Sequence, residues 1–127
     1  MTATPQMVRD INGSTADDTI IAPFIVAAEC VLVQVINNGC WVPSSVECRD
    51  MVQAYIAAHL MAQAGAGQAN TPIVKIKERF EAWSVETANA AASGEGIMAT
   101  QYGATANMMT NGCLVKLNKG NATVCFA

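Results

Sequence analysis

The sequence is poor in charged residues. Lys, Arg, Asp and Glu make up 13% of its 127 residues, hydrophobic residues make up 52%, and the formal net charge is −3. Without a cluster of Lys or Arg, the chain lacks the basic face that would wrap nucleic acid or lie on an anionic membrane. So little charge predicts a surface that partners cover, as in an obligate oligomer, although an alanine-rich domain can have the same composition.

The residues that usually carry chemistry are also scarce. His59 is the only histidine, and the cysteines occur without any CxxC pair. A metal site needs three or four convergent ligands, so we predict none, and we predict no cofactor. His59 falls on the apolar face of a predicted helix, which favours a buried structural histidine over the partner of a nucleophilic cysteine. The acidic residues fall mostly at predicted helix N-termini or on an exposed β-face. We therefore expect no catalytic residue and no enzyme.

The five cysteines are odd in number and scattered, at positions Cys30, Cys40, Cys48, Cys113 and Cys125. Cys30 and Cys48 fall inside predicted helices. This pattern predicts reduced, buried thiols in a cytosolic protein rather than a disulfide framework. The N-terminus has no basic segment followed by an apolar run, so we expect no signal peptide.

No hydrophobic run is long enough for a clear membrane span. The apolar stretch from Ile20 to Ile36 is short for a bilayer and is interrupted by Glu29 and Gln34, so we expect no membrane contact. Its wide apolar stripe predicts a helix over residues 20–36, which Ser14 or Thr15 could cap. Pro23 must lie in the first turn or kink this helix, because a proline ring clashes with the preceding turn.

The stretch that organises the chain runs from residue 43 to residue 64. Ser44 or Ser45 can cap a helix there, and Glu47 has the capping-box spacing from Ser44. Apolar residues recur at helical spacing and cover nearly all sides of the remaining turns, which is typical of a helix that other elements pack around. With the preceding helix and a short connection, it should form an antiparallel hairpin.

The remaining segments predict a mainly α fold with a small β element. We expect a flexible arm over residues 1–14, a helical domain over 15–112 and a β-hairpin tail over 113–127, in which Leu114 and Leu117 face Val124 and Phe126. A strand is expected over residues 82–87. Thr100 should cap a short third helix that ends at Asn111-Gly112.

Two segments resemble a known family. The first is Ala57-Ala58-His59-Leu60, and the second runs Gly96-Ile97-Met98-Ala99-Thr100-Gln101-Tyr102-Gly103 and continues through Met109. With the first long helix and the strand, they resemble the head–tail connector proteins of tailed bacteriophages, also called adaptor or head completion proteins. The family turn usually has proline where this chain has Gln101, which loosens the turn but keeps Thr100 as a cap and Gly103 as a permissive position.

The resemblance implies a structural virion protein of the neck, made in the host cytoplasm. Its subunits would form a homo-oligomeric ring, commonly dodecameric, between the portal protein and a tail-side neck or tail terminator protein, with DNA passing through the lumen. An acidic lining would let DNA slide. The candidate interface residues are Trp41, Trp83, Gln101, Tyr102 and Phe126, although either tryptophan could instead be a core residue.

Three other interpretations stay open. The chain could be a different neck or tail-completion component. It could be a small cytosolic ligand-binding or regulatory module with a pocket lined by Met98, Met108 and Met109, because methionine surfaces adapt to ligands. A cysteine-dependent enzyme is the weakest interpretation.

Overall fold

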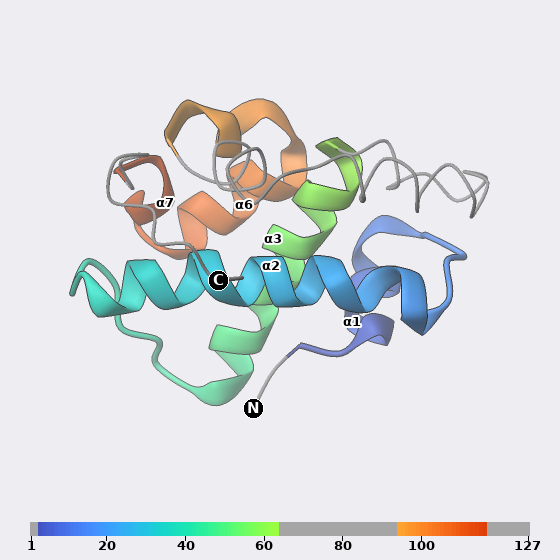
Figure 1. The fold of residues 1–127 in the computed structure, drawn as a ribbon. Coiled ribbons are helices and arrows are strands. Elements are labelled where there is room, and N and C mark those ends of the chain that lie inside the picture. Colours follow the sequence, from blue (N-terminus) through green and yellow to red (C-terminus); the bar gives the residue numbers. More distant parts are fainter. Residues whose placement is uncertain (1–2, 64–93, 117–127) are drawn as a thin grey trace.

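The computed structural model describes residues 3–63 and 94–116. In chain order they form α1 (Pro5–Asn12), α2 (Asp18–Asn37), α3 (Val46–Gln63), the 3₁₀ helix η1 (Gly94–Ala99), α6 (Gln101–Met109) and α7 (Cys113–Lys116) (Figure 1). The fold is mainly α, as predicted, and these two ranges contain no strand. The strand expected over residues 82–87 lies outside them.

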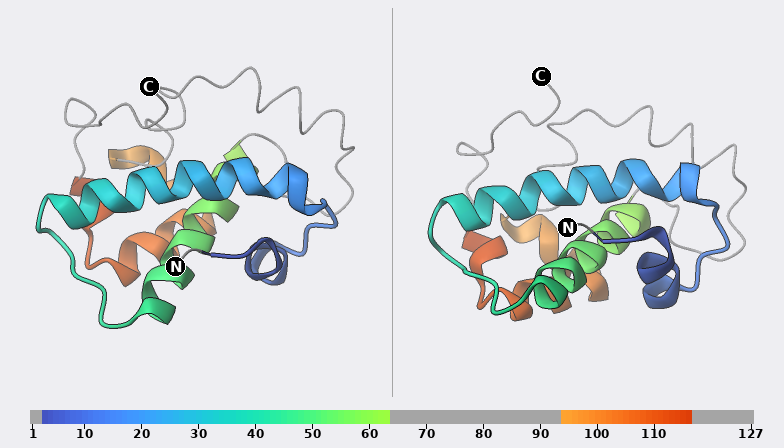
Figure 2. Two further views of the ribbon diagram at one scale, coloured as in Figure 1. Left: turned by 60° about the horizontal axis from the view of Figure 1, so that its bottom comes forward. Right: turned by 90° about the horizontal axis from the view of Figure 1, so that it is seen from below.

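Helix α3 occupies the centre, as the sequence predicts. It contacts α1, α2 and α6, and its buried side chains come from every side of the helix. Helices α2 and α3 run in opposite directions and cross obliquely, and α1 and α7 lie toward opposite ends of α2 (Figures 1 and 2). The predicted hairpin of two long helices is therefore confirmed. Ser45 caps α3, because its Oγ accepts a hydrogen bond from the backbone N–H of Cys48 at 3.1 Å.

Helix α2 is the most apolar element. Asp17 caps it, accepting a hydrogen bond from the N–H of Ile20 at 3.2 Å. Pro23 lies in the second turn, so one backbone bond of this helix is missing, yet the helix continues on both sides of it. By length and composition α2 could cross a bilayer, but 61% of its most apolar window is buried against the rest of the chain. The core helix of a globular domain has the same properties.

The N-terminal segment differs from the flexible arm that we expected. Residues 5–12 form α1, which Thr4 caps and Gly13 ends in a left-handed conformation with φ of 69°. Val8 is completely buried, and Arg9 bonds the carbonyl of Ala16 at 3.0 Å and pairs with Asp18 at 2.8 Å. The few apolar residues of this helix form a single stripe that packs against α2 and α3. The polar residues between them made this stripe hard to recognise in the sequence.

The prediction of a β-hairpin is also wrong for the first residues of the C-terminal tail. Residues 113–116 form the short helix α7, and Cys113 and Leu114 are buried in the core. Asn111, with φ of 58°, and Gly112 reverse the chain between α6 and α7, and this places Leu114 inward. Residues 117–127, which include Phe126, lie outside the described residues.

The prediction of reduced thiols is wrong for three cysteines. Cys40, in the connection between α2 and α3, forms a disulfide with Cys113 at the start of α7. Cys30 is also disulfide-bonded, whereas Cys48 is a free thiol. Cys40 and Cys113 are separated by 73 residues, and only the folded chain brings them together. Spacing could not predict that pairing, because it lacks any local signature.

Candidate functional site

The two segments that carry the family resemblance are in direct contact. His59, on α3, is completely buried, and its Nδ1 lies 2.6 Å from Oγ1 of Thr100 at the start of α6. The two residues are 41 positions apart in the sequence. This hydrogen bond joins the central helix to the second motif.

Thr100 makes two hydrogen bonds with one hydroxyl. Its Oγ1 accepts the backbone N–H of Gly103 at 3.1 Å, which is the capping interaction that the sequence predicts. The hydroxyl hydrogen remains free to be donated to Nδ1 of His59, and we assign it so, with the ring proton on Nε2. The cap of α6 and the orientation of the buried imidazole thus depend on each other.

Gly103 lies at the closest approach in this junction. A Cβ atom there would stand 1.9 Å from the carbonyl oxygen of Ile97 and 2.7 Å from Nδ1 of His59. The residue is helical and does not have a positive φ. We expected Gly103 to be a conformationally permissive position, but the structure requires glycine there because any side chain would collide with η1 and α3.

In the described residues, the junction is built from packing and hydrogen bonds. No group of three His, Cys, Asp or Glu residues in the described ranges could hold a metal ion. His59 is sealed from solvent, and its Nδ1 bonds a threonine hydroxyl. The arrangement fixes α6 and η1 against α3.

Gln101 and Tyr102 lie on the outer side of the same junction. Gln101 is exposed and Tyr102 is partly buried, and together with Ile11, Tyr55 and Thr105 they border a polar hollow of about 260 Å³. The hollow lies where α1, α3 and α6 meet. These two candidate interface residues are accessible to a partner.

The other candidate interface residues have different placements. Trp41 is 7% exposed, so it packs into the core and offers little surface for a partner. Trp83 and Phe126 lie outside the described residues. Of the two roles that the sequence left open for Trp41, burial favours the core role.

Exposed hydrophobic side chains occur on several elements, including η1 and α6. Met98 is 51% exposed and Met108 is 71% exposed, whereas Met109 packs against the core. The nearby Asn107 donates to the sulfur of Met98 at 3.6 Å and accepts from the N–H of Val115 at 3.0 Å. These methionines form a surface and line neither this hollow nor the larger one beside α2.

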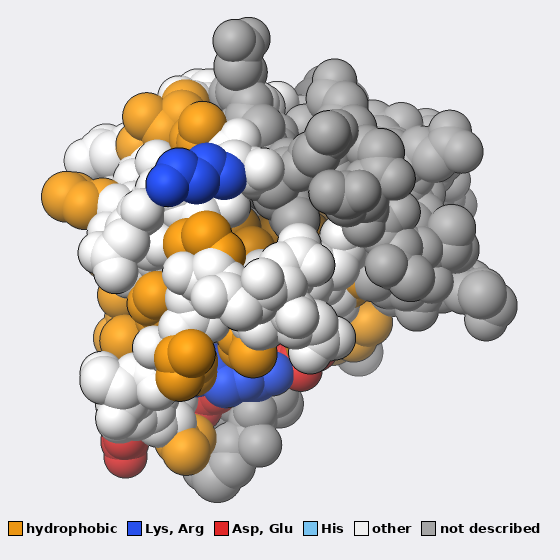
Figure 3. All heavy atoms as spheres, turned by 90° about the vertical axis from the view of Figure 1, so that its left-hand side faces the viewer, with side chains coloured by type: hydrophobic (Ala, Val, Ile, Leu, Met, Phe, Trp, Pro, Cys, Tyr) orange, Lys and Arg blue, Asp and Glu red, His pale blue; other side chains and the backbone are white. Residues whose placement is uncertain are grey.

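One side of the molecule carries several exposed hydrophobic side chains. It comprises the end of α2, the connection to α3, and α7 (Figure 1). Hydrophobic side chains are scattered across it, with few charged ones between them (Figure 3). Val42 and Val46, in and after the connection, are also exposed.

Sequence reasoning missed the polar side chain that holds the core together. Gln53 is completely buried on α3, and its hydrogen bonds reach residues 28 and 50 positions away. In the sequence, Gln53 interrupts a run of mostly apolar residues, and this interruption was the only signal of its role.

No family model, curated protein or solved structure matches the chain.

Proposed function

We propose that this chain is a structural subunit of the head-to-tail connector of a tailed bacteriophage. It would form a homo-oligomeric ring between the portal and the tail-side neck proteins, with DNA passing through the lumen. The observation that carries this proposal is the contact between the two motifs. A resemblance spread over unrelated parts of a fold would mean little, whereas His59 and Thr100 bond each other at 2.6 Å.

The surface of the chain supports an assembled state. Exposed hydrophobic residues occur on α2, on the connection to α3, on η1 and on α6, so more than one side could meet a partner. Subunits of a ring use two different faces, because each contacts a neighbour on either side. A formal charge of −3 also suits a channel that DNA must pass without binding.

The disulfide is compatible with a virion component. The cytoplasm keeps thiols reduced, whereas disulfides persist at virion surfaces and outside cells. A chain made in the host cytoplasm would begin with Cys40 and Cys113 as thiols, and the bond would close under oxidising conditions. The Cys40–Cys113 disulfide is therefore consistent with this proposal.

The competing ligand-binding module receives less support. It needs a pocket lined by methionines, but Met98 and Met108 are exposed on a surface. The polar hollow near Gln101 has walls from three helices and no methionine.

The mass of the purified protein in solution tests the proposal. Native mass spectrometry and light scattering are applied to the chain alone and then with a purified portal ring. We expect a large closed ring, or a monomer that forms one on the portal. Bovine serum albumin in place of the portal controls for non-specific association. A monomer or dimer that ignores the portal would refute the connector function.

A further inference from the structure

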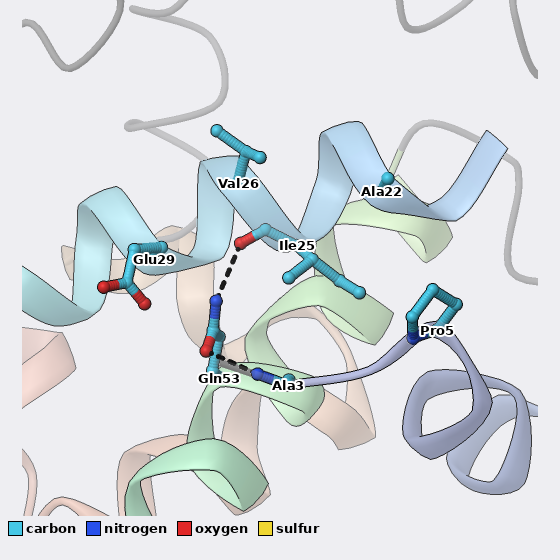
Figure 4. A pocket seen from close by; sticks show the side chains of 7 residues that line it. All are labelled: Ala3, Pro5, Ala22, Ile25, Val26, Glu29 and Gln53. Carbon is cyan, nitrogen blue, oxygen red and sulfur yellow. Dashed lines mark hydrogen bonds between the residues drawn. The ribbon is translucent and has the colours of Figure 1, made fainter. Parts of the chain in front are cut away.

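An apolar hollow of about 430 Å³ lies beside α2, against the residues that precede α1. Figure 4 shows it between Glu29 at one end and Pro5 at the other, with Gln53 and Ala3 on the side opposite α2. Val26, at its rim, is 53% exposed. A β-branched side chain this exposed, next to an apolar depression, leaves a hydrophobic surface uncovered.

The hollow is held open by buried hydrogen bonds. Gln53 donates through Nε2 to the carbonyl of Ile25 at 3.1 Å and accepts through Oε1 from the N–H of Ala3 at 2.9 Å (Figure 4). One side chain of α3 thus fixes both the α2 wall and the N-terminal wall. A partner would find the shape already formed, which lowers the entropic cost of binding.

Among the described residues, the end of the hollow at Glu29 is acidic. Arg49 pairs with Oε1 of Glu29 and lies 3.8 Å from Oδ1 of Asp50, so one guanidinium serves two carboxylates. Oε2 of Glu29 and Oδ1 of Asp50 are buried and accept no hydrogen bond. Glu29 lines the hollow and its side chain is 36% exposed, whereas Asp50 is buried and does not line it, so a cation of an incoming segment would lie nearest to Glu29.

The complementary chemistry exists in the chain itself. Residues 73–80, with the sequence IVKIKERF, combine Lys75, Lys77 and Arg79 with aliphatic neighbours, and they hold three of the seven Lys and Arg residues. A segment of this kind offers an apolar side chain for the hollow and a cation for the carboxylate of Glu29. No other stretch of the sequence combines the two so densely.

We propose that the hollow beside α2 is a docking site for residues 73–80 of a second copy of this chain. The hollow and the segment are different surfaces, so the contact is head-to-tail, and repeated contacts of this type close into a ring. This inference rests on the proposed ring function and names the contact that would build it. The apolar residues provide the buried area, and the attraction between Lys or Arg of the segment and Glu29 sets the register.

Two variants test the site from its two sides. Val26→Asp puts a charge at the rim of the hollow, and the double variant Lys75→Glu/Lys77→Glu reverses the charge of the segment. Val26→Thr keeps the shape of the side chain and is the matched control. In native mass spectrometry we expect each of the first two variants to be monomeric and Val26→Thr to assemble like the wild type. Circular dichroism confirms that all variants are folded.

Mixing the variants gives the sharper result. The Val26→Asp chain keeps an intact segment, and the double variant keeps an intact hollow, so an isotopically labelled mixture should form a heterodimer and nothing larger. A ring that survives Val26→Asp or the double variant would overturn the docking site and leave the connector function standing. A mixture without heterodimer would also overturn it.

A synthetic peptide of residues 71–82 separates the inference from the proposed function. Its binding to the full chain, measured by fluorescence anisotropy, should weaken roughly tenfold or more in Val26→Asp, because a carboxylate would be buried against aliphatic groups. Binding of this kind in a chain that forms no ring, alone or on the portal, would refute the connector function and keep the docking site. Equal binding to the wild type and to Val26→Asp would refute the docking site.

Discussion

At the scale of the residue, the most constrained position is a glycine inside a helix. Gly103 has an ordinary helical conformation, so its backbone does not need glycine. The need comes from the 1.9 Å that would separate a Cβ atom from the carbonyl oxygen of Ile97. The carbonyl oxygen of Ile97 belongs to the backbone of η1, and Nδ1 of His59 belongs to a completely buried side chain. Neither atom can move away from a Cβ atom without disturbing the packing around it.

Replacing Gly103 with alanine should therefore destabilise the fold. In an ordinary helix interior this change stabilises by up to about 1 kcal/mol, so the sign of the effect is the test. We expect a loss of about 1–3 kcal/mol, as for overpacked cores, measured by urea denaturation. Ala104→Gly, one position along and only partly buried, is the control and should lose about 1 kcal/mol at most. A Gly103→Ala protein more stable than the wild type would contradict the close packing.

At the scale of the element, α6 is positioned by its N-cap residue, Thr100. Thr100 satisfies the N–H of Gly103 and also the buried Nδ1 of His59. Removing the hydroxyl leaves a helix end and a buried ring nitrogen without these bonds. The hydroxyl therefore matters more than an exposed cap does.

Thr100→Ala should cost about 2–4 kcal/mol in the free energy of unfolding. A lost cap accounts for about 1 kcal/mol and a buried polar atom left unpaired for about 1–3 kcal/mol. Thr100→Ser should recover most of the stability, because it keeps the oxygen. Thr105→Ala is the control, since that hydroxyl donates only within α6, to the carbonyl of Gln101. Equal stability of the Thr100 and Thr105 alanine variants would rule out the shared role.

At the scale of the whole molecule, the disulfide joins parts that are far apart in the chain. Cys40 lies between the two long helices and Cys113 begins α7, so the bond closes a loop over a separation of 73 residues. Such a crosslink reduces the freedom of the unfolded chain. It also ties the last described helix to the hairpin of α2 and α3.

The double variant Cys40→Ser/Cys113→Ser should lose about 2–5 kcal/mol of stability relative to the oxidised wild type. Denaturant unfolding with and without a reductant measures it, and the reductant should have a smaller effect on the variant. Cys48→Ser is the control, because Cys48 is a free thiol and its loss should change stability by about 0.5 kcal/mol or less. Alkylation of Cys40 in the oxidised protein, before any reduction, would show that the bond is absent.

The sequence by itself determined that two long helices form and that α3 is the helix around which the others pack. The spacing of apolar residues predicted α2 and α3, and the capping residues predicted where α3 and α6 begin, because these signals act within a few residues along the chain. Thr100 as a cap and Asn111-Gly112 as a helix end were correct for the same reason. The predicted caps of α2, Ser14 or Thr15, were wrong, since Asp17 caps that helix. His59 was correctly expected to be buried.

Only the tertiary structure decided what those elements do to one another. The helical turn of α7 and the Cys40–Cys113 bond depend on contacts between segments that are distant in the sequence. The same holds for the bond from His59 to Thr100 and for the bridge made by Gln53. Local propensity carries no information about such pairings, because they follow from how the apolar faces of several helices pack together.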